Sequence, residues 1–253
     1  IILRFLIIFI IFCSFNKAQA WWEEPHRALC KAAINFISTE EKKEEILELI
    51  EDEEEWCIWA DDIKNDRPKT RPWHYVNLAK GDLTYSSSDC PRYGCIVSAL
   101  LEQISIYQNP KTPLWKKKEA LKFIGHFVGD VHQPFHVADV GDVGGNRMFL
   151  ELWDGTKTNF HALWDGILPG YALQFPLQKL DLSQISAKER ILTPEERISI
   201  WIRESRELLQ EEQIGYVQRL KSVDREYVLE NTKVAYYQLS LGATRLAALL
   251  EDI

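Results

Sequence analysis

Residues 120–136 decide the fold, and they read Ala-Leu-Lys-Phe-Ile-Gly-His-Phe-Val-Gly-Asp-Val-His-Gln-Pro-Phe-His. Their apolar side chains recur at helical spacing, which predicts a helix over residues 114–132. Pro134 lacks a backbone N–H and must bend or end that helix. His126 and Asp130 stand four positions apart, so both side chains project from one face of the helix about a turn apart. This face is a candidate metal-binding surface.

The chain carries the same spacing a second time, in Asn159-Phe-His161-Ala-Leu-Trp-Asp165. Imidazole and carboxylate are the ligands that zinc takes when thiolates are scarce. Two such pairs in one chain favour a metal site, although either pair alone would also fit a solvated salt bridge or a helix cap. The remaining histidines are His26, His74, His132 and His136.

Helical periodicity dominates the rest of the sequence. Helices are expected to start at Ser38-Thr39-Glu40-Glu41 and at Thr193-Pro194-Glu195-Glu196, which both resemble capping boxes. Apolar spacing predicts two more helices, over residues 96–108 and from about residue 224 to residue 250. The core-facing residues of the last helix are expected to be Val228, Val234, Tyr237, Leu241 and Leu246.

Signals for strands and loops are few. Residues 147–153 read as a strand, and Asp154-Gly155 after them is a hairpin turn signal. Loops are expected at residues 64–73 and 79–95, where proline, serine and glycine gather. These patterns predict an all-α protein, a mainly helical single domain with at most a short β-hairpin.

Residues 1–20 resemble a secretory signal peptide. Arg4 precedes a short apolar run, and the segment closes on Ala18-Gln19-Ala20. We therefore expect cleavage after this segment, which leaves residues 21–253 as one domain of a secreted or periplasmic protein. A transmembrane anchor is the alternative, but the apolar run is too short to span a bilayer. A bulky residue before Cys13 disfavours lipid attachment there.

Charge and cysteine usage narrow the function. Residues 21–253 keep 28 lysines and arginines against 38 aspartates and glutamates, a net charge of −10. Such a chain does not hold a duplex through a broad basic face, so a phosphate-rich substrate must be attracted locally, for example by bound metal. Four cysteines in an exported chain suggest disulfides. Cys90 and Cys95 could close a small loop, whereas pairing of Cys30 with Cys57 stays open.

Taken together, the motifs resemble those of one family. The chain is similar, along residues 21–253, to the zinc-dependent single-strand-specific nuclease and 3′-nucleotidase family of moulds, plants and bacteria, whose fold is shared with bacterial zinc phospholipase C. The motifs that carry the resemblance are Trp21 with His26, Trp59-Ala60-Asp61, Trp73-His74-Tyr75-Val76-Asn77, His126 to His136, Gly144-Gly145-Asn146, Asn159 to Asp165, Gly242-Ala-Thr-Arg245-Leu246, and the loop from Asp89-Cys90 to Gly94-Cys95.

The resemblance implies three Zn²⁺ ions bound by histidine and aspartate side chains. The first, buried zinc would take Asp61, His74, His126 and Asp130. The second would share Asp130 and add His26 with the amino group and carbonyl oxygen of Trp21. The third, more exposed, would take His136, His161 and Asp165.

Three further residues bear on this ligand set. His132 is left over and is interpreted as structural. Asp62 makes the choice of Asp61 ambiguous, although the Trp-Ala-Asp register favours Asp61. Trp22 stands where relatives commonly carry small residues, but it displaces no ligand.

The resemblance also implies roles in hydrolysis. Water activated on the buried zincs, one of them bound by Asp61, would attack phosphorus, and Lys64 would contact the developing negative charge. Asp61 and Lys64 are therefore the predicted catalytic residues. Tyr75 would stack on a base, and Asn77 and Asn146 would contact the edge of that base. The alternatives are a solvated loop lysine at position 64 and a core tyrosine at position 75.

These expectations describe a secreted phosphodiesterase that cuts single-stranded DNA and RNA endonucleolytically to 5′-phosphate products and also acts as a 3′-nucleotidase. A base must leave its stack before the phosphate can reach buried metals, which explains the preference for single strands. One alternative is a zinc phospholipase C, disfavoured because Asp165 stands where that group carries glutamate. The other is an exported zinc-binding protein without turnover. No stable protein partner and no membrane association after signal cleavage are implied.

Overall fold

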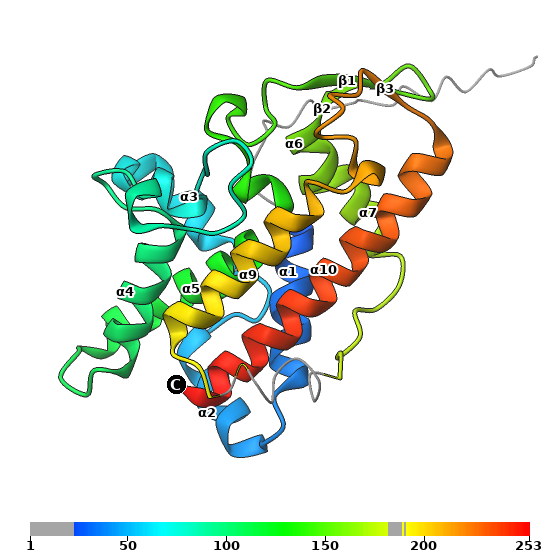
Figure 1. The fold of residues 1–253 in the computed structure, drawn as a ribbon. Coiled ribbons are helices and arrows are strands. Elements are labelled where there is room, and N and C mark those ends of the chain that lie inside the picture. The colour runs from blue at the N-terminus through cyan, green and yellow to red at the C-terminus, as the bar shows by residue number, and fades with distance from the viewer. Residues whose placement is uncertain (1–22, 182–188, 190) are drawn as a thin grey trace, which may run out of the picture.

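The structure, a computed structural model, describes residues 23–181, 189 and 191–253 (Figure 1). The expected signal peptide and Trp21 lie outside the described residues. The main helices are α1 (Glu23–Phe36), α2 (Glu40–Ile50), α3 (Trp59–Asp66), α4 (Ile96–Gln108), α5 (Leu114–Val131), α9 (Pro194–Leu208) and α10 (Arg225–Asp252). Shorter ones are α6 (Phe160–Ala162), the π-helical η5 (Leu163–Ile167) and α7 (Leu168–Ala172). The 3-10 helices are η1 (Pro68–His74), η2 (Ser87–Asp89), η3 (Pro134–Val137), η4 (Val140–Asp142) and η6 (Glu212–Ile214). This architecture confirms the prediction of a mainly helical protein.

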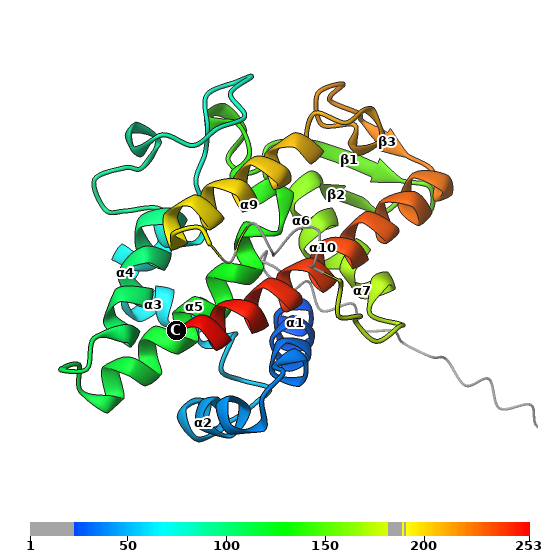
Figure 2. The ribbon, with the colours of Figure 1, turned by 60° about the horizontal axis from the view of Figure 1, so that its bottom comes forward.

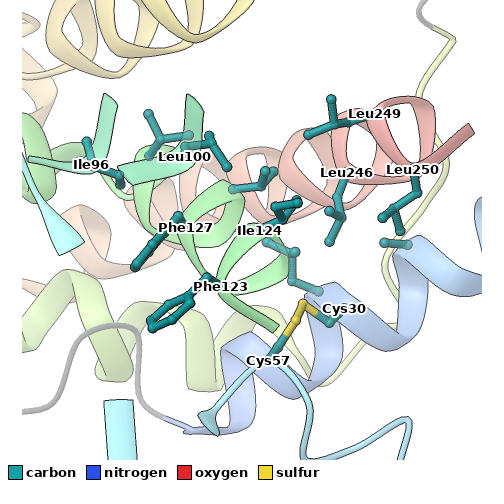
Figure 3. Packing of buried hydrophobic residues seen from close by; sticks show 14 of the residues in the cluster. Cys30, Cys57, Ile96, Leu100, Phe123, Ile124, Phe127, Leu246, Leu249 and Leu250 are labelled. Carbon is teal, nitrogen blue, oxygen red and sulfur yellow. A yellow bond between two sulfur atoms is a disulfide. The ribbon is translucent and has the colours of Figure 1, made fainter. Parts of the chain in front are cut away.

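Helix α5 is the central element of the bundle. It packs against α1, α2, α3, α4, α9 and α10, and every residue of α5 after Lys122 is buried. Figure 3 shows Phe123, Ile124 and Phe127 of α5 in one cluster with Leu100 of α4 and Leu246 of α10. A helix surrounded on all sides must be apolar nearly all round, so the polar side chains that it does carry need partners inside the core.

Two disulfides join elements around this core. Cys90 pairs with Cys95 as expected, and Cys30 of α1 pairs with Cys57, just before α3. Gly125 of α5 lies against the second bridge: a Cβ at this position would come within 2.6 Å of Cys57 Sγ and 2.5 Å of the Trp56 ring. Only glycine therefore allows α5 to approach the Trp56–Cys57 segment this closely.

A small sheet covers one end of the bundle (Figure 2). Strand β1 (Phe149–Leu152) pairs antiparallel with β2 (Lys157–Asn159), in the register Leu150 with Thr158, which is the expected hairpin. A third strand, β3 (Ser222–Val223), adds in parallel to β1, giving the order β2-β1-β3. The sequence does not predict β3, because a strand of two residues is too short to show an alternation of polar and apolar side chains.

Two of the expected helix starts have different outcomes. Thr193 forms the expected capping box: its Oγ1 accepts from Glu196 N at 3.3 Å, and its N donates to the Glu196 carboxylate at 2.8 Å. The box expected at Ser38-Thr39 is wrong. Thr39 makes no side-chain cap bond, and Ser38 N donates instead to the carboxylate of Glu251 in α10. A tertiary contact thus replaces the local one.

Two further expectations need correction. Residues 64–73 are not an open loop, because α3 continues to Asp66 and a 3-10 helix, η1, follows with Pro68 in its first turn. Tyr237 is 46% exposed and does not face the core, whereas Leu241 and Leu246 do. Within the described part of the chain, none of the helices combines the length and hydrophobicity that crossing a bilayer requires.

Candidate metal centre

Asp130 is the residue around which the candidate centre is built. It lies in the last turn of α5 with none of its side chain exposed. One carboxylate oxygen lies 3.0 Å from His74 Nδ1 and 3.1 Å from His126 Nε2, and the other lies 3.3 Å from His26 Nε2. These histidines come from η1, α5 and α1. One carboxylate therefore joins three parts of the chain.

Asp61 closes one side of this group. Its Oδ1 lies 3.5 Å from both His74 Nδ1 and His126 Nε2, and its side chain is 6% exposed. The neighbouring Asp62 is exposed and contacts none of these histidines. The position of Asp61 in the first turn of α3 explains the difference, since the next residue on a helix points about 100° away.

The second helical pair forms a separate group with His136. His161 Nε2 lies 2.8 Å from Asp165 Oδ2, and His136 Nε2 lies 3.7 Å from Asp165 Oδ1. His161 is in α6 and Asp165 is in the π-helical turn η5. Pro134 starts the 3-10 turn η3, which turns His136 toward this pair after α5 has ended.

The geometry fits metal ions at three positions. The potential ligand atoms lie within 4.8 Å of one another in each group, and the groups are His26, His126 and Asp130; Asp61, His74 and His126; and His136, His161 and Asp165. Several of these buried atoms, including both ring nitrogens of His26 and Nε2 of His136, lack a hydrogen-bond partner among the described residues. Leaving such atoms unpaired costs about 1–3 kcal/mol each, and coordination would satisfy them.

Main-chain carbonyls fix the orientation of three of the rings. Nδ1 of His126 donates to Cys57 O at 2.6 Å, and Nδ1 of His136 donates to His74 O at 2.6 Å. Nδ1 of His161 donates to Gly144 O at 2.7 Å. A carbonyl only accepts, so Nδ1 carries a proton in each of these rings, and Nε2 is the ring nitrogen left for the centre. Proteins commonly orient metal-binding histidines in this way.

Burial and nearby charges shift the pKa values of His26, Asp165 and His136. Burial is the largest cause that lowers the pKa of His26, to about 4, so this ring is neutral. Burial opposes ionisation of Asp165, but His161 and His136 bring its pKa to about 2. Burial also opposes protonation of His136, yet Asp130 and Asp165 raise its pKa to about 9. A cation bound there would replace that proton.

A pocket of about 560 Å³ opens beside the centre. Its lining includes His74, His136 and His161 together with Lys64 and Tyr75. Lys64 Nζ lies 2.6 Å from Asp61 Oδ1, and Tyr75 is 41% exposed. The alternative of a core tyrosine is therefore wrong, and Lys64 is not a solvated loop lysine.

Asn77 and Asn146 line the same pocket. Asn146 Nδ2 donates to Val143 O at 3.0 Å, which leaves its side-chain oxygen directed elsewhere. Asn77 Oδ1 is buried and has no hydrogen-bond partner in the described part of the chain. The structure thus brings together every predicted site residue except Trp21, which it does not describe.

Two residues beside the centre have different relations to it. His132 is buried but faces away, with Nδ1 donating to Val128 O at 2.7 Å and Arg245 3.2 Å from Nε2. Gln133, which the sequence analysis missed, donates from Nε2 to Asp165 and accepts from Phe135 N through Oε1 at 2.5 Å. Gln133 stands between the end of α5 and Pro134, where the buried chain turns. The backbone groups of such a turn need polar partners, and this is the sequence signal that could have identified Gln133.

The chain is thus a mainly helical protein with three groups of histidine and aspartate side chains that could hold metal ions. The model of one family, S1/P1 Nuclease, matches residues 21–253. The chain belongs to the S1/P1 nuclease family. Membership supports nuclease activity, that of a hydrolase acting on nucleic acids.

Individual relatives agree with the family match. Endonuclease 4 of Arabidopsis thaliana is 29% identical over 94% of this chain and 90% of its own length. Endonuclease 1 of the same plant is 30% identical over 72% of this chain and 65% of its own length. Nuclease S1 of Aspergillus oryzae is 31% identical over 50% of this chain and 47% of its own length.

Proposed function

We propose that this chain is a secreted zinc-dependent nuclease that cuts single-stranded DNA and RNA endonucleolytically to 5′-phosphate products and that also acts as a 3′-nucleotidase. The observation that carries the proposal is that histidines from two of the three histidine and aspartate groups line one pocket, with an exposed tyrosine at its wall. Residues 21–253 form the catalytic domain in this proposal, and residues 1–20 are the removed signal peptide. Two disulfides are compatible with export.

Three zinc ions are held by the same side chains that the family resemblance implies. The first is held by Asp61, His74, His126 and Asp130, the second by Asp130, His26 and the main-chain amino and carbonyl groups of Trp21, and the third by His136, His161 and Asp165. Bound zinc lowers the pKa of water and stabilises negative charge on phosphate oxygens. The three carbonyl-bonded rings of His126, His136 and His161 are oriented without zinc, so little reorganisation is needed on binding.

Lys64 and Asp61 work as a pair. The ammonium group of Lys64 lies at the pocket wall, 2.6 Å from the Asp61 carboxylate. That contact holds the lysine charge beside the place where a phosphate would approach the centre. Lys64 therefore stabilises the negative charge that grows on phosphate oxygens in the transition state.

Tyr75, Asn77 and Asn146 account for strand preference. The pocket of about 560 Å³ has room for a base, and a base can enter it only after leaving its neighbours. Tyr75 provides the stacking surface, while the two asparagines offer donors and acceptors for the edge of the base. A duplex presents neither free bases nor a phosphate that reaches the buried centre.

Metal analysis combined with assays tests the proposal. The protein should contain about three zincs and should hydrolyse single-stranded DNA, RNA and a 3′-nucleotide much faster than duplex DNA. Chelation should abolish all these activities and lower the melting temperature, and zinc should restore both. Hydrolysis of phosphatidylcholine instead of nucleic acid would favour the phospholipase C alternative. Full activity after verified metal removal would contradict the mechanism.

Substitution of Tyr75 tests the base pocket. Tyr75→Ala should reduce kcat/KM on single strands by about 10- to 100-fold, the scale of one lost stacking contact. Tyr75→Phe keeps the ring and should remain close to the unsubstituted protein. Tyr93→Ala removes another exposed tyrosine and serves as the matched control. A small phosphate ester without a base should be much less sensitive to Tyr75→Ala than the oligonucleotide is.

A further inference from the structure

Arg71 is a cation at the pocket wall that the proposed hydrolysis does not use. It lies in η1, three residues before His74, and it lines the pocket next to Lys64 and Asn65. Its Nε donates to Lys64 O at 3.2 Å, and its Nη2 donates to Asn65 Oδ1 at 3.4 Å. Both acceptors are neutral, so these bonds position the guanidinium without cancelling its charge.

Arg67, one turn earlier, behaves differently. Its guanidinium is paired with the carboxylate of Glu119 at 2.5 Å and lies over the Trp59 ring. Arg71 has no carboxylate within ion-pair distance in residues 23–181, 189 and 191–253, although the whole chain carries a net charge of −8. An arginine held in place beside a pocket and left without an acidic partner is available to an anionic ligand.

Lys64 and Arg71 cannot serve the same phosphate in the same way. Lys64 Nζ lies 2.6 Å from Asp61 Oδ1, which holds the lysine charge at the metal centre. In the proposed function this charge acts on the phosphate that is cleaved there. Arg71 is attached to the other side of Lys64, through the carbonyl, and its Nη1 has no acceptor among the described residues. A guanidinium with free N–H groups binds phosphate oxygens through paired, charge-assisted hydrogen bonds.

We propose that Arg71 binds the phosphodiester next to the one being cleaved and so distinguishes a polynucleotide from a mononucleotide. The inference rests on the proposed function, because it assigns a second phosphate of the same substrate. A 3′-nucleotide has a single phosphate, which the metal centre takes, and it gives Arg71 nothing to bind. An oligonucleotide has a neighbouring phosphate one nucleotide away. Arg71 therefore contributes to KM for chains and little to hydrolysis of mononucleotides.

Short substrates with one and two phosphates test this role. The dinucleotide TpT contains only the cleaved phosphodiester, whereas TpTpT adds one neighbour. Arg71→Gln should lower kcat/KM for TpTpT by about tenfold, mainly through KM, as expected for one lost charge-assisted hydrogen bond. The loss on TpT and on a 3′-nucleotide should be several times smaller. Arg71→Lys, which keeps the charge but not the fork, should recover part of the loss.

Two controls keep the result specific. Lys69→Gln removes one exposed charge from the same short helix without touching the pocket, so it reports the general electrostatic effect. A TpTpT analogue with a neutral methylphosphonate at the non-cleaved linkage should be a poorer substrate for the unsubstituted protein and should respond little to Arg71→Gln. Melting temperatures should agree among the variants, because Arg71 bonds only to exposed groups.

Each outcome has a definite meaning. Equal losses on TpT and TpTpT, or equal effects of Arg71→Gln and Lys69→Gln, would overturn the assignment of Arg71 to a neighbouring phosphate. Absence of hydrolysis of every nucleic-acid substrate by the unsubstituted, zinc-loaded protein would instead overturn the proposed function. The two failures are therefore distinguishable in one set of assays.

Discussion

His126 with Asp130 and His161 with Asp165 share one spacing but stand in very different surroundings. The first pair lies in the straight helix α5, fully buried, and Asp130 is approached by histidines from α1, η1 and α5. The second pair spans α6 and a π-helical turn, and the His161 side chain is 14% exposed. Equal spacing thus gives one group inside the main apolar core and one beside a second, smaller apolar cluster that contains Phe160, Leu163 and Trp164.

Substitution of Asp130 and of Asp165 should give the largest difference between the two pairs in zinc content and melting temperature. Asp130→Asn should lose about two zincs, because the Asp130 carboxylate lies beside His26, His74 and His126, which hold the first two zincs in the proposal, and should lower activity by at least about a hundredfold. It should also lower the melting temperature markedly, since metal binding there joins distant segments. Zinc content, calorimetry and turnover on single-stranded DNA measure these effects.

Asp165→Asn should lose about one zinc, keep most of the melting temperature and still lower turnover. Asp62→Asn is the matched control, because this exposed carboxylate next to Asp61 borders none of the three groups. Equal zinc losses and equal melting temperatures for Asp130→Asn and Asp165→Asn would show that the two pairs are equivalent.

Gln133 should matter to the second pair only. Gln133→Leu removes the donor to Asp165 and leaves one carboxylate oxygen without that partner. Loss of such a supporting hydrogen bond typically weakens metal affinity by about 10- to 100-fold. We expect competition with a chelator to remove the third zinc first in this variant. Gln238→Leu, at an equally buried glutamine that donates to His132 O, should reduce stability without selective zinc loss.

Gly144 should give the smallest effect. It has φ of +62°, and an added Cβ would lie 3.0 Å from Phe135 O and 3.2 Å from His161 Nδ1. Gly144→Ala should therefore cost about 1–2 kcal/mol of unfolding free energy and weaken zinc binding at His161 modestly. Gly141→Ala meets no atom within 4 Å and should be nearly neutral in the same denaturation experiment. Identical stabilities of the two variants would argue against strain at Gly144.

Much of the fold follows from the sequence because α5 and α10 are long helices, of 18 and 28 residues, whose apolar residues recur over several turns. The capping box at Thr193 could also be predicted, because its two partners are only three residues apart in the sequence. The outcome at Ser38 could not be predicted, because Ser38 N donates to the carboxylate of Glu251, more than two hundred residues away in the sequence. Local pattern predicts local bonds and fails where a tertiary partner competes.

The candidate site divides in the same way. Helical spacing alone identified the two histidine and aspartate pairs, while the family resemblance was needed to join them with Asp61, His74 and His136. Gln133 and Arg71 escaped both approaches. Their roles depend on which groups lie opposite them in the folded chain, and no spacing within one segment contains that information.

Because of the disulfide between Cys30 and Cys57, zinc binding at the proposed centre should depend on oxidation state. Cys30 is one helical turn from His26, Asp61 is four residues beyond Cys57, and Cys57 O orients the His126 ring. Closing a loop of this length removes about 3–4 kcal/mol of chain entropy from the unfolded state. Oxidation thus brings two ligand-bearing segments together before any metal binds. We therefore expect the disulfide to form first during maturation and zinc to bind second. Reduced protein refolded with zinc should bind the metal more weakly than oxidised protein does.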